Sequence, residues 1–365
     1  MATVLVAGGG TGGHIFPGIA IARELMAARA GTEVIFVGTE RGLEAKIIPA
    51  QGFRLLTIRS AGITGKRIGA RLKGMAIIPV SMAQSLSLIG RTKPDLVIGV
   101  GGYSSGPVLA SAVVRRVPTL IHEQNYVPGV TNRWLAPFVR EVAVTFEETL
   151  EKLGGRGVVT GNPVRREFTL VKPKSPGDPI RHLLVVGGSQ GARVINRAIC
   201  DALPALARLG ELLRVTHQTG AADYEWVAAA YQAAGFGANR ASVIPFIAKA
   251  WEAFESADLV VSRCGSTTLA ELTAAARPAV LIPLAAATHD HQTFNASKLV
   301  STGAAVMIAE QDLTGETLAT AVTSLLGNPD RLGRMSAASR SLGRPDAAVL
   351  IAGLCDKLMS KGRAA

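Results

Sequence analysis

Two glycine-rich turns, about half a chain apart, constrain what this sequence can fold into. Each follows an apolar run typical of a β-strand: residues 4–7 lead into 8–13, and residues 183–186 lead into 187–192. A strand, a glycine turn and a helix together hold phosphate in many α/β proteins. Glycine permits the tight turn, and the helix N-terminus offers unpaired N–H groups to an anion. The repetition predicts two similar domains that face one phosphate-bearing ligand.

The two halves of the chain continue to match after these turns. Asp95 and Asp258 each precede a further apolar run that ends in glycine and hydroxyl residues. A third apolar run in each half leads to a polar cluster, at 122–125 and at 289–292. Open parallel sheets bind ligands beyond the carboxyl ends of their strands. Apolar runs also alternate with amphipathic stretches, so we expect an α/β fold with doubly wound parallel sheets.

Length and local composition predict where the domains divide. A chain of 365 residues suits two domains better than one. Residues 161–165, followed by the Pro/Lys/Gly-rich stretch 172–179, have the character of a linker. We therefore expect an N-terminal domain at 1–164, completed by a closing helix at about 343–365, and a C-terminal domain at 165–342.

Charge and cysteine content narrow the class of protein and its partners. The formal net charge of +12 indicates an anionic partner: nucleic acid, anionic lipid or a phosphorylated substrate. Nucleic acid is the weaker choice, because only 5% of residues are aromatic and no aromatic–basic stripe is present. The three cysteines are few and widely spaced, which favours a reduced protein without a cysteine-based metal site. Neither a signal peptide nor an apolar run long enough to span a membrane is evident, which favours the cytosol.

Familiar nucleotide motifs fit the first glycine turn poorly. Gly8, Gly10 and Gly13 satisfy GxGxxG, but the acid expected about 20 residues further on is missing, since Glu40 lies beyond that spacing. No P-loop lysine and no pair of aspartates at i and i+2 occurs. If a nucleotide diphosphate is the leaving group, backbone amides, hydroxyls and arginine must hold it without metal. Arg165, Ser189 and 266–268 offer such groups, although hydroxyls at a helix start are also common N-caps.

Three ionisable residues are candidates for chemistry. Glu271 lies one turn into a helix predicted to begin near Ser266, where it either accepts hydrogen bonds from a ribose diol or complements the helix dipole. His14 lies at a predicted helix start, where a neutral imidazole would suit a general base. His122 follows a strand beside Glu123. A lone histidine is more often structural, so both histidines retain that alternative.

A basic and apolar segment near residue 70 allows two interpretations. Four cations precede an apolar set, which would suit the surface of an anionic membrane. An ordinary core helix with a solvated basic lead is the alternative. The residues are Lys66, Arg67, Arg71, Lys73, Met75, Ile77 and Ile78.

Six motifs in a fixed order resemble the MurG family of bacterial peptidoglycan glycosyltransferases. They lie at 9–14, 101–107, 122–125, 161–165, 187–192 and 290–292, and the likeness covers nearly the whole chain. The resemblance implies a GT-B fold, in which two Rossmann-like domains face an interdomain cleft. It implies an inverting transferase without cofactor that moves GlcNAc from UDP-GlcNAc to the C4 hydroxyl of MurNAc in lipid I, forming lipid II. Such enzymes work peripherally at the cytoplasmic face of the inner membrane, beside cell-wall and division proteins.

The resemblance also implies a role for particular residues. The C-terminal domain would hold the donor and the N-terminal domain the acceptor. The residues themselves add the anionic membrane on the N-terminal side and make His14 the first candidate for the base, with His122 the next. The acceptor diphosphate would meet Gly101, Gly102, Tyr103 and Ser104. Donor contacts would come from Thr11, Gly12, Gly13, Asn125, Arg165, Ser189, Ile247, Ser266, Thr267, Thr268, Leu269, Ala270, Glu271 and Gln292. Residues 248–250 depart from the family, which has acidic residues and Met there, so their part in covering the nucleotide is open.

Two other functions remain open from the sequence. One is a GT-B transferase with a different sugar or lipid acceptor, such as a diacylglycerol glycosyltransferase. The other is a non-catalytic module that binds a nucleotide-sugar or dinucleotide. The motifs at 122–125 and 290–292 favour the peptidoglycan enzyme over the other transferase.

Overall fold

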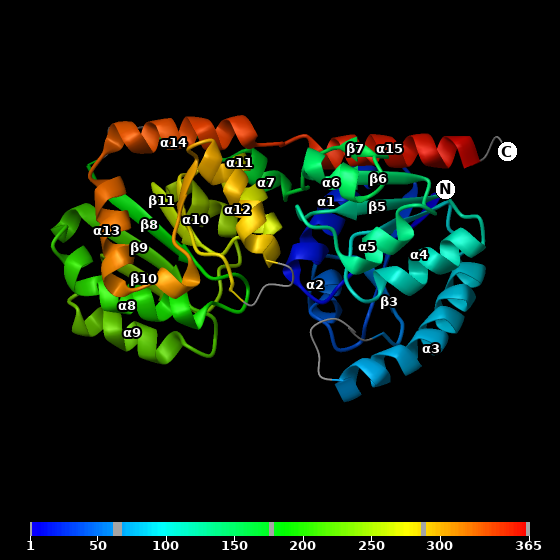
Figure 1. The fold of residues 1–365 in the computed structure, drawn as a ribbon, viewed down its shortest axis with the longest axis horizontal. Helices are drawn as coiled ribbons and strands as arrows, with labels where there is room; N and C mark the ends of the chain where they lie inside the picture. The colour runs from blue at the N-terminus through cyan, green and yellow to red at the C-terminus, as the bar shows by residue number, and fades with distance from the viewer. Residues whose placement is uncertain (1, 61–67, 175–178, 286–289, 363–365) are drawn as a thin grey trace. The chain divides into compact units, whose positions relative to one another are not determined.

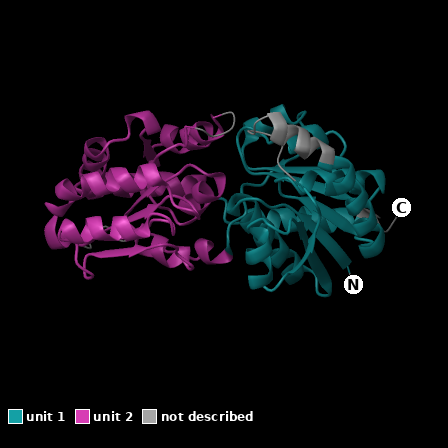
Figure 2. Ribbon diagram, turned by 90° about the horizontal axis from the view of Figure 1, so that it is seen from below, with its two compact units in different colours: residues 1–165, 344–365 teal, residues 166–343 magenta. Residues whose placement is uncertain are grey.

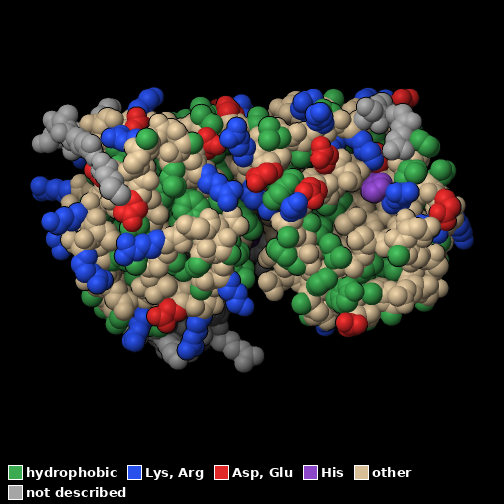
Figure 3. All heavy atoms as spheres, turned by 180° about the vertical axis from the view of Figure 1, so that it is seen from behind, with side chains coloured by type: hydrophobic (Ala, Val, Ile, Leu, Met, Phe, Trp, Pro, Cys, Tyr) green, Lys and Arg blue, Asp and Glu red, His purple; other side chains and the backbone are tan. Residues whose placement is uncertain are grey.

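The chain forms two compact units, described here from a computed structural model (Figures 1 and 2). Unit 1 comprises Met1–Arg165 with Arg344–Ala365, and unit 2 comprises Arg166–Gly343. The structure describes residues 2–60, 68–174, 179–285 and 290–362. Lys and Arg side chains are spread over the visible face of both units, as the net charge of +12 would suggest (Figure 3).

Unit 1 is built on a seven-stranded parallel sheet in the order β3-β2-β1-β4-β5-β6-β7. Its strands are β1 Ala2–Ala7, β2 Thr32–Gly38, β3 Arg54–Thr57, β4 Leu96–Gly99, β5 Thr119–Glu123, β6 Glu141–Val144 and β7 Val158–Val159. Its helices are α1 Gly12–Ala28, α2 Glu44–Ala50, α3 Ile68–Thr92, α4 Ser105–Val114, α5 Val130–Leu135, α6 Glu147–Lys152 and α15 Ala347–Gly362.

Both faces of this sheet are buried, which explains why its strands are apolar without alternation. Val4 and Val6 of β1 pack with α1 and with Ile351 of α15 on one face. Leu5 and Ala7 of the same strand pack on the other face, against helix α4 among others. The closing helix expected from the sequence is α15, which lies along α1 (Figure 1).

Unit 2 repeats the plan with a six-stranded parallel sheet in the order β10-β9-β8-β11-β12-β13. Its strands are β8 Arg181–Val186, β9 Leu213–Gln218, β10 Ala241–Ile244, β11 Leu259–Ser262, β12 Ala279–Leu281 and β13 Ala305–Met307. Its helices are α7 Arg166–Thr169, α8 Arg193–Ala207, α9 Tyr224–Ala233, α10 Ala250–Ser256, α11 Ser266–Ala274, α12 His291–Ser301, α13 Gly315–Leu326 and α14 Pro329–Leu342. The predicted fold class of two doubly wound parallel-sheet domains is confirmed.

The aspartate repeated in the two halves joins the central strands of each sheet. Asp95 Oδ2 accepts the backbone N–H of Thr3 at 2.8 Å, which ties the start of β4 to the start of β1. Asp258 Oδ2 accepts the backbone N–H of His182 at 2.7 Å and ties β11 to β8 in the same way. The repeat therefore marks the amino edge of each sheet, whereas the glycine turns lie at the opposite, carboxyl edge.

Candidate functional site

The glycine turns after β1 and β4 lie against each other at the carboxyl edge of unit 1. Gly102 has a φ of +86°, and a Cβ at this position would collide with the carbonyl oxygen of Gly9. Gly101 has a φ of +89°, and a Cβ there would lie only 2.7 Å from Cδ2 of His14. Glycine is therefore required at both positions, because no side chain fits this backbone conformation and spacing. The close approach brings His14 beside residues 101–104.

His14 is oriented by the turn that precedes it. It lies in the first turn of α1, and its Nδ1 is 3.2 Å from Oγ1 of the N-cap residue Thr11. The opposite edge of the ring packs on Gly101. The side chain is half-buried. His14 is thus a fixed imidazole at the edge of the sheet where substrates bind in this class of fold.

His122 lies in the interior. It belongs to strand β5, is fully buried, and its Nε2 is 3.2 Å from the carbonyl oxygen of Gly161. Burial lowers the pKa of His122 to about 4, with a smaller contribution from the charge of His14, so the ring is neutral at pH 7. The geometry suits a residue that positions the 161 segment rather than one that meets a substrate.

A second buried group on β5 organises the loop that carries Asn125. The carboxylate of Glu123 accepts hydrogen bonds from the backbone of Asn125 at 2.9 Å, the backbone of Gly129 at 2.9 Å and Nδ2 of Asn132 at 2.8 Å. Burial raises the pKa of Glu123, and these hydrogen bonds oppose the shift. The loop therefore closes around one carboxylate, which sets the place of Asn125.

Glu44 was missed by sequence reasoning and occupies the first glycine turn. Its carboxylate accepts the backbone N–H of Gly10 at 2.8 Å and both the backbone N–H and the hydroxyl of Thr39 at 2.9 and 2.7 Å. Burial opposes ionisation, but the bonds from Gly10 and Thr39 outweigh it and lower the pKa of Glu44. Gly9 leaves room for this carboxylate, which a Cβ would strike. The amide of Gly10 is thus already bound to an internal anion.

The loop after β4 presents both exposed and buried polar groups. Tyr103 is 49% exposed, and its carbonyl accepts the hydroxyl of Ser60 at 2.7 Å. Ser104 is buried, and its Oγ has no hydrogen-bond partner among the described residues. At the end of unit 1, the guanidinium of Arg165 lies 4.9 Å from the ring centre of Phe16.

In unit 2, one glutamine side chain joins the glycine turn to the loop after β10. Nε2 of Gln218, at the end of β9, donates to the carbonyl of Gly188 at 2.7 Å. Its Oε1 accepts the backbone N–H of Ile247 at 3.2 Å. Gln218 therefore holds together the exposed turn that carries Ser189 and the segment that carries Ile247. A glutamine at the end of a strand, directly before Thr-Gly, was the available sequence signal.

A buried network of polar side chains supports the same glycine turn from the protein interior. Oδ1 of Asn196 lies 3.0 Å from Nε2 of His217, while its Nδ2 donates to Oδ2 of Asp223 at 2.9 Å. Asp223 also receives two bonds from Arg193 at 2.9 and 2.6 Å, which lower its pKa. Burial lowers the pKa of His217 to about 3, so this histidine is neutral. The network fixes the start of α8, where the glycine turn ends.

Helix α11 and Gln292 complete the carboxyl edge of unit 2. Helix α11 begins at Ser266 after the N-cap Gly265, as predicted, and Glu271 lies one turn further on, nearly buried. Oε1 of Gln292 accepts the backbone N–H groups of Cys264 and Leu284 at 3.2 and 3.0 Å, so it joins the loops after β11 and β12. The segments that follow the strands of this sheet carry nine of the expected donor contacts: Ser189, Ile247, Ser266, Thr267, Thr268, Leu269, Ala270, Glu271 and Gln292. The other expected donor contacts belong to unit 1: Thr11, Gly12, Gly13, Asn125 and Arg165.

The basic and apolar segment is described only in part. Lys66 and Arg67 lie outside the described residues, as do the side chains of Arg71, Lys73 and Met75 on α3. On the same helix Ile77 is half-buried and Ile78 is 41% exposed.

Within the described ranges, no three His, Cys, Asp or Glu residues are grouped as a metal site would require.

Comparison with known proteins defines the class. Residues 4–144 match the glycosyltransferase family 28 N-terminal domain, and residues 182–351 match the family's C-terminal domain. The division into two parallel-sheet units agrees with this pair of domains. The chain is thus a two-domain glycosyltransferase.

Individual relatives narrow the class further. The "UDP-N-acetylglucosamine--N-acetylmuramyl-(pentapeptide) pyrophosphoryl-undecaprenol N-acetylglucosamine transferase" of Anaeromyxobacter sp. is 47% identical over 361 residues, 98% of this chain and 94% of the relative. The protein of the same name from Geobacter sulfurreducens is 46% identical over 95% of this chain and 96% of its own length. The crystal structure of Acinetobacter baumannii MurG superposes with a TM-score of 0.77 at 31% identity, covering 98% of this chain and all of that one. The chain belongs to the MurG family, which confirms the resemblance seen in the sequence.

Proposed function

We propose that this protein transfers GlcNAc from UDP-GlcNAc to the C4 hydroxyl of MurNAc in lipid I and so forms lipid II. The observation that carries the proposal is the 47% identity, over nearly the whole chain, to a transferase named for this reaction. The C4 oxygen forms a bond to the anomeric carbon while the bond from that carbon to the UDP oxygen breaks, with inversion. The hydroxyl proton passes to a base, and UDP departs as the anion.

Unit 2 is proposed as the donor side. Its carboxyl edge combines an exposed glycine turn, the N-terminus of α11 and the carboxylate of Glu271. Amides and hydroxyls at the turn and at Ser266 and Thr267 would hold the diphosphate, and Glu271 would accept hydrogen bonds from the ribose diol. Gln218 keeps Gly188 and Ile247 at a fixed separation, so the two ends of the nucleotide would meet a prearranged surface.

Unit 1 is proposed as the acceptor side, with His14 as the base. His14 is half-buried and oriented by Thr11, whereas His122 is enclosed, so we assign proton transfer to His14 and a positioning role to His122. We place the acceptor diphosphate on residues 101–104, where the buried Oγ of Ser104 has no hydrogen-bond partner within the described part of the chain. The amide of Gly10 is taken by Glu44, so this amide is not assigned to the acceptor. The donor contacts proposed from unit 1 remain Thr11, Gly12, Gly13, Asn125 and Arg165.

We further propose that unit 1 binds the anionic, cytoplasmic surface of the bacterial inner membrane peripherally, where cell-wall and division proteins would be its neighbours. Ile78 on α3 is 41% exposed, and Trp134 on α5 is 75% exposed. Arg133 adjoins Trp134 on α5, and aromatic and cationic side chains together favour the interface of an anionic bilayer. Among the described residues, no helix combines the length and the apolar character needed to cross a bilayer.

A reconstituted reaction tests the proposed function and its rivals. The protein is incubated with radiolabelled UDP-GlcNAc and a water-soluble lipid I analogue, and the disaccharide product and UDP are quantified. We expect the two products in equal amounts. Transfer to diacylglycerol but not to the lipid I analogue would identify another lipid glycosyltransferase. Donor binding without transfer to either acceptor would identify a non-catalytic binding module.

A further inference from the structure

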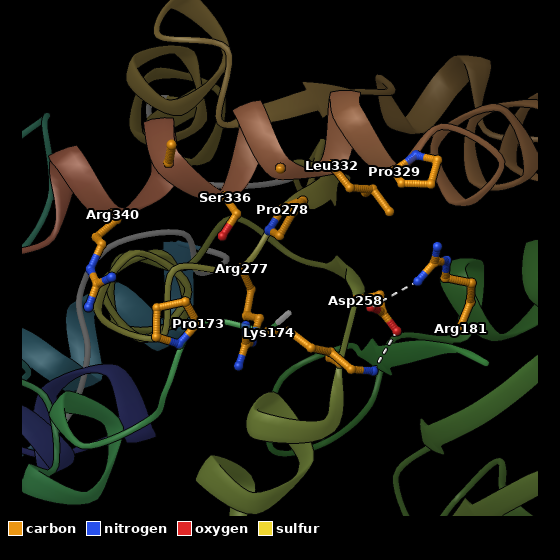
Figure 4. A pocket seen from close by; sticks show the side chains of 13 residues that line it. Pro173, Lys174, Arg181, Asp258, Arg277, Pro278, Pro329, Leu332, Ser336 and Arg340 are labelled. Atoms are coloured by element: carbon orange, nitrogen blue, oxygen red, sulfur yellow. Dashed lines mark hydrogen bonds and ion pairs between the residues drawn. The ribbon is translucent and has the colours of Figure 1, made fainter. Parts of the chain in front are cut away.

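A hollow lies at the amino edge of the unit 2 sheet (Figure 4). The loops proposed to bind the donor follow the opposite, carboxyl ends of the strands. Its volume is about 320 Å³. The starts of β8, β11 and β12 and one face of α14 line it. The polar side chains in the lining are Lys174, Arg181, Asp258, Arg277, Ser336 and Arg340.

The lining carries four cations and one carboxylate, and that carboxylate is shared. Asp258 Oδ2 lies 2.7 Å from Nζ of Lys174, and Oδ1 lies 4.0 Å from Nη1 of Arg181 (Figure 4). The same Oδ2 atom also accepts the backbone N–H of His182. The single carboxylate of Asp258 therefore interacts with two cations and a backbone N–H. Because the lining holds four cations and one carboxylate, the hollow has an excess of positive charge.

Arg277 adds a buried cation whose described hydrogen-bond partners are neutral. Its side chain is 2% exposed. Nε donates to the carbonyl of Phe254 at 2.7 Å, and Nη2 donates to the carbonyls of Lys172 and Glu255 at 2.7 and 3.1 Å. Burial lowers the pKa of Arg277 to about 10, so the guanidinium stays charged at neutral pH. Carbonyls satisfy its N–H groups but do not cancel its charge. The charges of Asp258 and Glu255 oppose the effect of burial on its pKa only in part, and burying a charge without a close ion pair is unfavourable.

Arg340 supplies a cation at the exposed side of the hollow. It extends from α14 on the side of the hollow away from Arg181 (Figure 4). Within the described part of the chain it forms no ion pair, in contrast to Lys174 and Arg181. Arg340 is therefore available to an incoming anion.

We propose that this hollow binds a phosphate-bearing small molecule, with Arg277 as the buried charge and Lys174 and Arg340 as the groups that contact the phosphate. Guanidinium and ammonium groups are the usual partners of phosphate in proteins. The volume is at the lower end of the range for small-molecule pockets and leaves room beyond a single phosphate. Because the donor loops lie at the other end of the strands, this anion and the donor would bind at the same time. The proposal does not depend on which sugar or acceptor the enzyme uses.

Calorimetry of the full chain with saturating UDP tests the proposal, because UDP then occupies the donor site. The probes are inorganic pyrophosphate and glucose 1-phosphate. We expect one equivalent of probe to bind in the hollow, apart from any that binds at the proposed acceptor site of residues 101–104, with an affinity that falls as NaCl is raised. Arg340→Gln should weaken binding about tenfold, which is the loss of one charge-assisted contact. Arg334→Gln is the matched control, since Arg334 is an exposed cation on α14 outside the lining.

Each result decides the proposal. Tighter binding of glucose 1-phosphate than of pyrophosphate assigns the hollow to an organic phosphate, and the reverse assigns it to an inorganic one. An absence of heat with both probes at millimolar concentration would overturn the proposal. So would equal weakening by Arg334→Gln and Arg340→Gln, because the anion would then respond only to the general charge of the surface. UDP binding is measured separately, so a failed donor site is distinguished from a failed anion site.

Discussion

Exposure distinguishes the two histidines that were candidates for the base, of which the sequence favoured His14. The sequence placed both after strands, and both were candidates for the base; in the structure His14 follows β1, whereas His122 lies within β5. His122 is fully enclosed and bound to a carbonyl, whereas His14 is half-buried at the helix start and held by Thr11. A base must reach the proton that it removes, so the placement of His14 supports its proposed role better than the placement of His122 would.

Replacing His14 with alanine should therefore reduce turnover far more than donor binding. We expect kcat to fall by about 10²–10⁴-fold, the usual effect of losing a general base. Steady-state kinetics with the lipid I analogue gives kcat, and calorimetry gives the dissociation constant for UDP-GlcNAc. If both quantities change by the same factor, His14 is a donor-side or structural residue instead.

Glu271 should contribute to donor binding rather than to folding. Glu271→Ala removes the proposed charged acceptor for the ribose diol, which is worth about 1.5–3 kcal/mol. The dissociation constant for UDP-GlcNAc should rise by roughly 10–150-fold. Glu316→Ala, at an exposed position on α13, is the control and should leave it unchanged. Unaltered donor affinity in a Glu271→Ala protein that melts normally would refute the ribose assignment.

At the scale of elements, contacts between loops decide whether the glycine turns can hold a ligand. The side chain of Gln218 joins the turn after β8 to the segment after β10, because it hydrogen-bonds to Gly188 in the one and to Ile247 in the other. The backbone of the same turn also lies against the loop after β9, since a Cβ at Gly191 or at Gly220 would strike the other loop. Such support keeps a flexible turn in the geometry that binding needs.

Gln218→Ala should loosen the glycine turn and weaken donor binding. Gly188 and Ile247 would each lose a partner, and we expect the KM for UDP-GlcNAc to rise by about 5–20-fold with a smaller change in kcat. Hydrogen exchange at residues 187–192 should become faster, which distinguishes loosening from a lost direct contact. Gln232→Ala, exposed on α9, is the control. A normal KM with unchanged exchange would show that the turn needs no such support.

Helix α3 should carry part of the proposed membrane contact. Ile78→Asp places a charge on an exposed apolar position and should reduce binding to anionic vesicles several-fold, while UDP-GlcNAc binding stays normal. Val349→Asp, on the exposed face of α15, is the matched control. Vesicle flotation at low and high salt measures both variants, and salt should weaken wild-type binding. Equal losses in the two variants would place the membrane contact elsewhere.

For the whole molecule, a buried neutral histidine in each unit makes stability depend on pH. The pKa of His122 is about 4 and that of His217 about 3, both below the ordinary 6.5. The unfolded chain takes up protons below pH 6.5 that the folded chain excludes, so stability is full above that pH and is lost as pH falls toward 4. Each unit of pKa corresponds to about 1.4 kcal/mol.

His122→Gln should flatten this dependence in unit 1. Glutamine retains a donor for the carbonyl of Gly161 but does not titrate. Between pH 7.5 and 4, wild type should lose about 3 kcal/mol relative to the variant in urea unfolding. Arg334→Gln serves as a control that should follow wild type. Parallel pH profiles of wild type and His122→Gln would show that His122 does not titrate as proposed.

The sequence by itself determined that the chain has two similar domains, that their sheets are parallel, and to which family the chain belongs. These follow from local signals: apolar runs buried on both faces, glycine turns behind them and helices of the expected period. The starts of α11 and α15 were also predictable, because the residues that begin a helix are neighbours in sequence.

Only the tertiary structure decided what lies around the candidate groups. Glu44 enters the first glycine turn from another helix, and Gln218 joins two loops that are far apart in the chain. The burial of His122 and the crowding of cations around Asp258 likewise depend on strands brought together from distant segments. Burial and counter-charge are properties of an environment, and the environment of a side chain exists only once the sheet has assembled.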